Sequence, residues 1–214
     1  MAIFLIIAAI VLAIPFLVLF GLFHVAISGF EKLGFAPEAV FGVLLLILVG
    51  SLINIPLGRR RLMEVEESRF FGLMKRRRMQ AQGLSINVGG AVIPLVLVLY
   101  LLPRVPLRET LLASSLMIVI CFLLARFIPG KGIAIPVFFP AFFATIFALV
   151  LAFGAAAPVA FISGVLGVII GGDVLHLPRV MREGQGIMSI GGAGVFDGIF
   201  LVAIIATFLA GLSG

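Results

Sequence analysis

The sequence predicts an all-α fold: a polytopic transmembrane bundle of seven helices, with its N-terminus in the cytoplasm and its C-terminus outside. Of the 214 residues, 63% are hydrophobic and only 11% are charged, whereas about a quarter of an ordinary soluble domain is charged. A mean hydropathy of +1.37 cannot be hidden in one globular core, because a domain of this size keeps a large solvated surface. These values exclude a soluble enzyme, a disordered tail and a nucleic-acid module.

Seven apolar stretches predict seven spans, since a spanning helix needs roughly 20 apolar residues. They cover residues 2–23, 37–56, 84–103, 110–128, 133–153, 157–177 and 187–210. The first is too long for the core of a signal peptide and has no basic start, so we expect it to be retained as a helix. The connections are short, and several contain Pro or Gly, which favours a single transmembrane domain over residues 1–214.

The basic residues orient these spans. Segment 59–78 contains eight of the 15 Lys and Arg residues. If this segment is cytoplasmic, four more basic residues fall on the same side: Arg126, Lys131, Arg179 and Arg182. Three remain outside: Lys32, Arg104 and Arg108. Such an excess of Lys and Arg is typical of the cytoplasmic side, and it fixes the predicted orientation of both termini.

The longest loop, at about residues 57–83, is strongly basic. Its clusters are Arg59, Arg60, Arg61, Lys75, Arg76, Arg77 and Arg78. We expect them to anchor the topology in the lipid bilayer and to rest on anionic lipid headgroups. A short interfacial helix is expected around residues 70–74. The pI of 10.7 therefore reflects topology, and no nucleic-acid partner is expected.

Two acidic residues, Asp173 and Asp197, fall within predicted spans. A charged residue at the centre of a lone helix costs roughly 2.5–3.5 kcal/mol on insertion scales, so each is expected to face a partner or a water-filled cavity. Each lies near two glycines spaced four apart, which would let spans six and seven approach closely. These pairs are Gly167 with Gly171 and Gly194 with Gly198. In this hairpin of spans the two carboxylates would face one another.

Regular helices would leave these carboxylates at different depths, by roughly 9 Å at about 1.5 Å per residue. The difference closes if the two helices start at different heights, or if the glycine-rich stretch 191–194 is unwound, as in helices that are broken where backbone lines a cavity. A similar stretch opens the third span. Residues 85–91 and 189–193 both read Ser-Ile and then Gly-Gly-Ala, which indicates either a parallel repeat whose broken helices meet at one site or a chance similarity of glycine-rich segments.

The predicted site lies between spans three, six and seven. Its lining residues are Asn87, Gly89, Gly90, Gly171, Gly172, His176, Gly192, Gly194 and Gly198. Neither a metal nor a cofactor is expected, because His24 and His176 lie in different spans, Cys121 is the only cysteine and no HExxH motif occurs.

Three functions are consistent with this site, with an intramembrane aspartyl protease as the leading prediction and a transporter or channel as the alternative. In an intramembrane aspartyl protease, Asp173 and Asp197 form the catalytic pair, which shares a proton and activates water to hydrolyse membrane peptides. In a cation- or proton-coupled transporter or channel, the same two acids and Asn87 are ligands. In a non-catalytic scaffold, small-residue helix faces drive assembly, for example as a homodimer.

Purely structural roles are open for both acids. Near the cytoplasmic surface, Asp173 would pair with a basic side chain or with His176. The basic candidates are Arg179 and Arg182. Asp197 would be kept neutral by a hydrogen bond between helices.

Four motifs carry a family resemblance. They read Ser-Ile-Asn-Val-Gly-Gly-Ala-Val-Ile-Pro at 85–94, Gly-Ile-Ala-Ile-Pro at 132–136, Gly-Gly-Asp-Val-Leu-His-Leu at 171–177 and Ser-Ile-Gly-Gly-Ala-Gly-Val-Phe-Asp-Gly-Ile-Phe at 189–200. Over about residues 40–211 the chain resembles a prokaryotic membrane family, domain of unknown function number 1614. This resemblance implies an inner-membrane location and no established activity.

A fainter similarity is to the presenilin-like and prepilin-peptidase aspartyl proteases. These families place one Asp on one span and a second in Gly-x-Gly-Asp on a later span. Asp173 matches the first position loosely. Asp197 follows Gly192-Ala-Gly194 with two further residues in between. The similarity implies that these two acids are the catalytic residues.

Overall fold

The computed structural model describes residues 2–58, 61–69, 74–128, 132–183, 187–192 and 198–212. Helices dominate this part of the chain. The α-helices are α1 (Ala2–Lys32), α2 (Pro37–Gly50), α3 (Ile93–Leu101), α4 (Leu107–Leu124), α5 (Phe138–Leu151), α6 (Ala156–Leu166), α7 (Leu177–Glu183) and α8 (Gly198–Gly211). Shorter elements are the π-helices η1 (Val88–Val92) and η4 (Gly167–Asp173) and the 3-10 helices η2 (Leu102–Arg104), η3 (Phe153–Ala155) and η5 (Val174–His176).

Every predicted span contains helix, and the sixth continues without a break from α6 through η4 and η5 into α7. The prediction of a predominantly helical chain is therefore confirmed. The all-α assignment is wrong, because strands occupy several span ends. The strands are β1 (Asn54–Pro56), β2 (Arg61–Arg69), β3 (Met74–Asn87), β4 (Arg126–Ile128), β5 (Gly132–Ala134) and β6 (Ile187–Ile190).

These strands shorten the helices. Among the described residues, two helices are long and apolar enough to cross a membrane, Leu107–Leu124 and Phe153–Arg182. Four further apolar helices have only 10–17 residues: Pro37–Gly50, Val88–Arg104, Phe138–Leu151 and Gly198–Gly211. The predicted spans are longer than these helices because hydropathy counts apolar residues alike in helix and strand. Their additional residues include 54–56, 84–87 and 187–190, where backbone groups pair with another strand.

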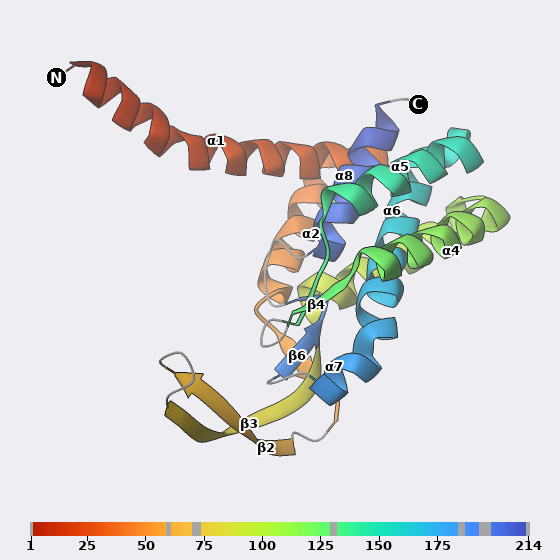
Figure 1. Ribbon diagram of the computed structural model, residues 1–214. Helices are drawn as coiled ribbons and strands as arrows, with labels where there is room; N and C mark the ends of the chain where they lie inside the picture. Colours follow the sequence, from red (N-terminus) through yellow and green to blue (C-terminus); the bar gives the residue numbers. More distant parts are fainter. Residues whose placement is uncertain are drawn as a thin grey trace.

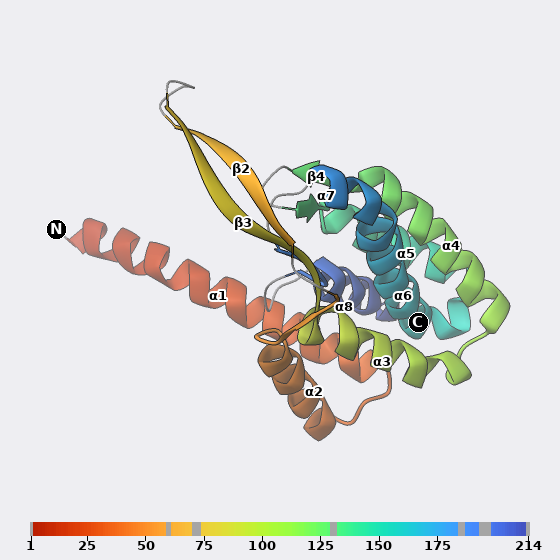
Figure 2. The same ribbon diagram turned by 90° about the horizontal axis from the view of Figure 1, so that it is seen from below.

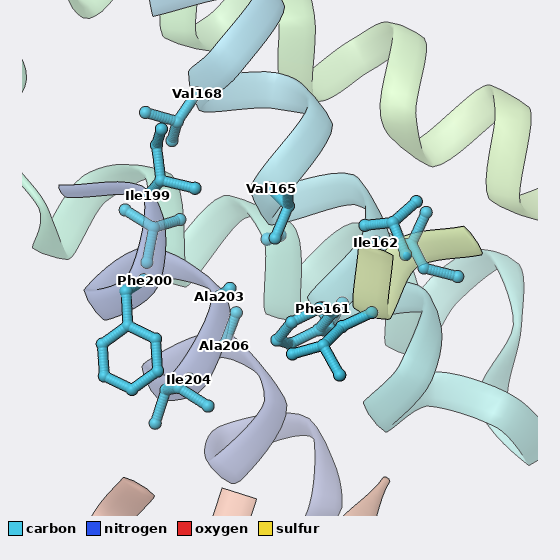
Figure 3. Packing of buried hydrophobic residues seen from close by; sticks show 14 of the residues in the cluster. Phe161, Ile162, Val165, Val168, Ile199, Phe200, Ala203, Ile204 and Ala206 are labelled. Atoms are coloured by element: carbon cyan, nitrogen blue, oxygen red, sulfur yellow. The ribbon is translucent and has the colours of Figure 1, made fainter. Parts of the chain in front are cut away.

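α6 is the centre of the helix packing. It is apolar on all sides and buried along almost its whole length, as expected of a helix surrounded by others. α4, α5 and α8 pack against it. Figure 3 shows the contact with α8, where Phe161 and Val165 lie beside Ala203 and Ala206. At Gly164 the two helices come close, because a Cβ there would lie 3.4 Å from the Cα of Ala203.

The predicted glycine pair Gly167 and Gly171 lies against α4. A Cβ on Gly167 would lie 2.8 Å from the Cβ of Met117, and a Cβ on Gly171 would overlap the carbonyl oxygen of Ile118. The expectation that this pair brings spans six and seven together is therefore wrong. It brings spans six and four together, because the missing side chains make room for the α4 backbone.

β2 and β3 form a long antiparallel ribbon, with Arg61 opposite Gln82 and Arg69 opposite Met74. Figure 2 shows this ribbon extending away from the helices. The interfacial helix expected around residues 70–74 falls mostly on residues 70–73, which lie outside the described residues; Arg69 ends one strand and Met74 begins the next. Hydrogen bonds between the strands satisfy the backbone groups that a helix would have paired internally.

The elements separate towards two ends of the molecule. Figure 1 shows β2, β3, β4, β6 and α7 at one end and the C-terminal end of α8 at the other. Lys32 of α1 also lies at the second end, where its Cγ would be 2.6 Å from a Cβ on Gly211. The N-terminal half of α1 extends beyond the other helices (Figure 1).

Candidate functional site

The two Ser-Ile segments lie side by side. β3 and β6 pair in parallel, with Ser85 opposite Ser189 and Ile86 opposite Ile190. Successive side chains of a strand point to opposite faces, so the serines share one face and the isoleucines share the other. The isoleucines pack on the hydrophobic core. The similarity of the two segments in sequence thus corresponds to a contact in space.

β1 extends the serine face on the other side of β3. It runs antiparallel to β3, with Asn54 opposite Asn87 and Pro56 opposite Ser85. Three adjacent strands therefore present Asn54, Ser85, Asn87 and Ser189 on one face of the sheet. This polar face lies where β3 and β6 each give way to a glycine-rich segment and then to helix.

Asn87 is the buried centre of this polar face, with no exposed surface. Its Nδ2 donates to the carbonyl oxygen of Ser51 at 2.7 Å and to Oδ1 of Asn54 at 3.2 Å. Its Oδ1 accepts from the backbone N–H of Gly90 at 2.7 Å and so caps the first turn of η1. The amide therefore joins the end of α2, β1 and the start of the third helix.

Gly89 makes this junction compact. A Cβ on Gly89 would overlap the carbonyl oxygen of Ile47 and the backbone nitrogen of Ser51. Gly50, at the end of α2, lies against Gly89 in the same contact. Gly89 of the third span therefore serves the close approach of α2 and η1, which places Asn87 beside the carbonyl of Ser51.

Two hydroxyls complete the polar face. Ser189 Oγ donates to Oδ1 of Asn54 at 2.7 Å, and Ser85 Oγ donates to the carbonyl oxygen of Met188 at 3.2 Å. Beside them lies a pocket of about 240 Å³, whose polar lining is Asn54, Ser85 and Ser189. Its apolar lining includes Pro56, Leu84 and Ile187. The pocket is open to the outside and lies at the base of the β2–β3 ribbon.

Asp173 joins the end of η4 to the second glycine-rich segment. Its Oδ2 accepts from the backbone N–H of Gly191 at 3.0 Å, and its side chain is half-buried. Gly191 and Gly192 have φ values of 81° and 66°, in the left-handed region that glycine tolerates best. A Cβ on Gly191 would lie 2.6 Å from the Cβ of Ala91. The two Gly-Gly-Ala segments therefore touch, and Asp173 holds the start of the second.

Unwinding of the stretch 191–194 is one of the two predicted ways in which Asp173 and Asp197 reach the same depth. In the described part of that stretch, Gly191 and Gly192 form a turn after β6 and are not helical. Gly194 and Asp197 lie outside the described residues. Gly198 begins α8, and a Cβ there would meet nothing within 4 Å.

The other predicted lining residues of η4 have packing contacts. His176 Nδ1 lies 3.1 Å from the carbonyl oxygen of Gly171, and its ring centroid is 4.8 Å from that of Phe122. A Cβ on Gly172 would overlap the Cδ1 of Ile135. These residues position η4 against α4 and the segment before α5, whereas Asp173 turns towards Gly191.

The predicted headgroup residues belong to the ribbon. Arg61 lies in β2, and Lys75, Arg76, Arg77 and Arg78 lie in β3, opposite residues 65–68. Arg59 and Arg60 lie outside the described residues. Within the described ranges, no group of three His, Cys, Asp or Glu side chains is placed to hold a metal ion.

Sequence reasoning missed Asn54 as a site residue and quoted Ser85 and Ser189 only as part of a repeat. A usable signal was present, because polar and apolar residues alternate in Asn54-Ile55, in Ser85-Ile86-Asn87 and in Ser189-Ile190. Alternation with period two is typical of a strand with one polar face.

Comparisons with known proteins give one family. No curated protein and no solved structure matches the chain, so the similarity to presenilin-like and prepilin-peptidase proteases stays a prediction. The family model described as "Protein of unknown function (DUF1614)" matches residues 48–209, which include the polar face, Asp173 and both glycine-rich segments. The chain therefore belongs to the DUF1614 family.

Proposed function

We propose that the chain is a multi-pass protein of the inner membrane, one transmembrane domain with seven spans, a cytoplasmic N-terminus and an external C-terminus. Large apolar side chains on the outer surfaces of α1, α2, α4 and α5 support this, including Phe20, Leu46, Leu123 and Phe138, which are exposed. Soluble monomers rarely expose contiguous apolar patches of such extent. The basic ribbon, Arg126 and α7 lie at the end that we assign to the cytoplasm.

Within this membrane protein, we propose that the polar face and Asp173 form the site of a cation- or proton-coupled transporter or channel. The observation that carries the proposal is the meeting of two glycine-rich junctions, each of which follows a strand and precedes a helix. β3 and β6 pair beside one another, each ahead of a glycine-rich segment, and Asp173 accepts a hydrogen bond from the second segment. Interrupted helices that expose backbone and carboxylate groups are typical of ion-coupled transport sites.

Flux through reconstituted protein tests this function. The full chain is placed in vesicles that contain a pH-sensitive dye, and proton movement is followed after an external pH or sodium jump. We expect Asp173→Asn to reduce the flux at least tenfold, because the amide keeps an acceptor for Gly191 but carries no charge. Glu38→Gln, an exposed acid at the start of α2, is the matched control and should leave the flux unchanged. Wild-type vesicles without flux would contradict the proposal.

An aspartyl protease is the second candidate. It is favoured by the hydrogen bond between Asp173 and Gly191, because Gly191 opens the motif in which Asp197 follows six residues later. In this proposal the two acids share a proton and activate water. Incubation with single-pass membrane peptides and mass spectrometry of the products tests it. Cleavage that is abolished both by Asp173→Asn and by Asp197→Asn supports the protease, and cleavage that survives either substitution excludes it.

Two further proposals concern partners. The ribbon is proposed to rest on anionic lipid headgroups, because the segment 61–78 carries clustered Lys and Arg residues and projects from the end assigned to the cytoplasm (Figure 2).

A homodimer, with the chain as a non-catalytic scaffold, is the third candidate function. It predicts that Asp173→Asn changes stability alone, with neither flux nor cleavage in the wild type.

A further inference from the structure

We infer that the pocket beside β1, β3 and β6 binds a neutral group that carries several hydroxyls, of the size of glycerol to a monosaccharide. Its volume of about 240 Å³ is below the roughly 300–1,000 Å³ of sites for drug-sized ligands. The mixed lining suits such a group, because Asn54, Ser85 and Ser189 are polar whereas Pro56, Leu84 and Ile187 contact C–H surfaces.

The direction of the hydrogen bonds favours this class of ligand. Ser189 Oγ donates its proton to Asn54, and Ser85 Oγ donates its proton to the carbonyl of Met188. Each serine oxygen can therefore still accept a hydrogen bond through its lone pairs, whereas the amide nitrogen of Asn54 can donate hydrogen bonds. A ligand hydroxyl matches both, because it donates to a serine oxygen and accepts from the amide. An anion requires several donors and is poorly matched.

The charge of the pocket favours a neutral ligand over a cation. Its described lining contains no acidic side chain, so a bound cation would have no countercharge at contact distance.

The pocket is also connected to the buried site. Asn54 Oδ1 accepts from Ser189 at the pocket and from Nδ2 of Asn87 behind it. A ligand in the pocket would therefore lie at the outer end of the polar face that leads to Asn87. Its role as transported cargo rests on the proposed function, whereas binding itself does not.

Two sources supply this chemistry, a free polyol and a lipid with a glycerol or sugar headgroup. The second source is suggested by exposed apolar residues in and directly after β1, since Ile55 and Leu57 are exposed at the end assigned to the cytoplasm, although neither lines the pocket. The experiment has one arm for each source, and both use the full chain.

In the first arm, saturation-transfer NMR of the purified protein in detergent measures binding of glycerol and of glucose. In the second, the protein is placed in nanodiscs of a neutral glycosyl diacylglycerol mixed with phosphatidylcholine, and native mass spectrometry counts the retained glycolipids. We expect Ser85→Ala with Ser189→Ala to weaken binding at least fivefold in one arm, because two hydrogen bonds are lost. Ser189→Thr keeps a hydroxyl and should retain binding.

The matched control is Ser115→Ala, which removes an exposed hydroxyl that bonds within α4, and it should leave binding unchanged. If the double variant does not fold, Ser189→Ala alone is tested, because Ser189 is only half-buried and its hydroxyl can be removed at less cost to the fold. This single variant should weaken binding at least twofold. Binding in neither arm, or binding unaffected by loss of the serine hydroxyls, overturns the inference. Preferential binding of sodium or phosphate ions to the wild type overturns it as well.

The two proposals fail separately. Polyol or headgroup binding without any flux would support the proposed ligand of this pocket and overturn the proposed transporter function. A proton or sodium flux that depends on Asp173, without polyol or headgroup binding, would leave the transporter standing and overturn the pocket.

Discussion

Asn87 connects three chain segments through one side chain, and its burial makes these bonds matter for stability. We expect Asn87→Ala to lower the free energy of unfolding by at least about 2 kcal/mol, because each buried group left without a partner costs about 1–3 kcal/mol. The groups are the carbonyl of Ser51 and the N–H of Gly90. Denaturant unfolding in detergent measures the change.

The control for this substitution is Asn54→Ala. The Asn54 side chain is exposed, and Asn87 keeps its shorter bond to Ser51 when Asn54 is removed, so the cost should stay below about 1 kcal/mol. If both variants lose the same free energy of unfolding, the hydrogen bonds of buried Asn87 contribute no more to stability than those of an exposed amide.

Asp173 positions Gly191 through an acceptor oxygen, and this role is separable from its charge. Asp173→Ala removes the acceptor, so we expect faster hydrogen–deuterium exchange in peptides that contain Gly191. Asp173→Asn keeps an acceptor oxygen and should leave exchange close to that of the wild type. Equally fast exchange in both variants would show that the charge, and not the acceptor, holds this turn.

At the scale of elements, the contact between α2 and η1 depends on the absence of a side chain at Gly89. We expect Gly89→Ala to destabilise the protein by about 1–3 kcal/mol or more, because the methyl group would force backbone shifts. Gly42→Ala in α2 is the control, since a Cβ there meets nothing within 4 Å, and it should stabilise by up to about 1 kcal/mol. Unfolding midpoints of both variants decide the matter. If Gly89→Ala leaves the stability unchanged, the close contact between α2 and η1 is contradicted.

The β2–β3 ribbon is a second element with a testable role. Only β3 residues 83–87 pair with β1 and β6, so replacing residues 61–82 by a short turn removes the ribbon and keeps the polar face. We expect an unchanged melting temperature, because an isolated two-stranded ribbon adds little stability. Recovery of the variant in phosphatidylglycerol-containing membranes should fall relative to neutral ones. If the variant keeps the wild-type preference for anionic lipid, the ribbon is not the part of the protein that contacts the headgroups.

At the scale of the whole molecule, the proposed orientation is open to a labelling experiment. Cys121 is buried and is the only cysteine, so Cys121→Ala gives a background for single reporters at two exposed positions, Arg182→Cys and Leu212→Cys. A membrane-impermeant maleimide should label the first in inverted vesicles and the second in intact cells. The reverse pattern would place the ribbon outside.

Sequence alone predicted the helical content and the order of the seven apolar stretches, because hydropathy follows burial in a nonpolar environment. It did not predict the strands, because an apolar residue contributes equally to the hydropathy of a strand and of a helix. Nor did it show that Gly167 and Gly171 face α4 rather than α8, since glycine spacing identifies a contact face but not its partner. Asn54 was missed because its role depends on pairing with Asn87, a contact distant in sequence.

The pairing of β3 with β6 has a consequence for biogenesis. Ser85 bonds to a residue 103 positions later, and Asn54 to one 135 positions later. At about 5–20 residues per second of synthesis, Asn54 and Ser85 wait several seconds in the nascent chain before these partners are made. Asp173 likewise receives the N–H of Gly191 only after β6 has followed it out of the ribosome. The polar face is thus completed only when the last strand, β6, has been made, so a chain that ends before it lacks both the strand partner of Ser85 and the hydrogen-bond partner of Asp173.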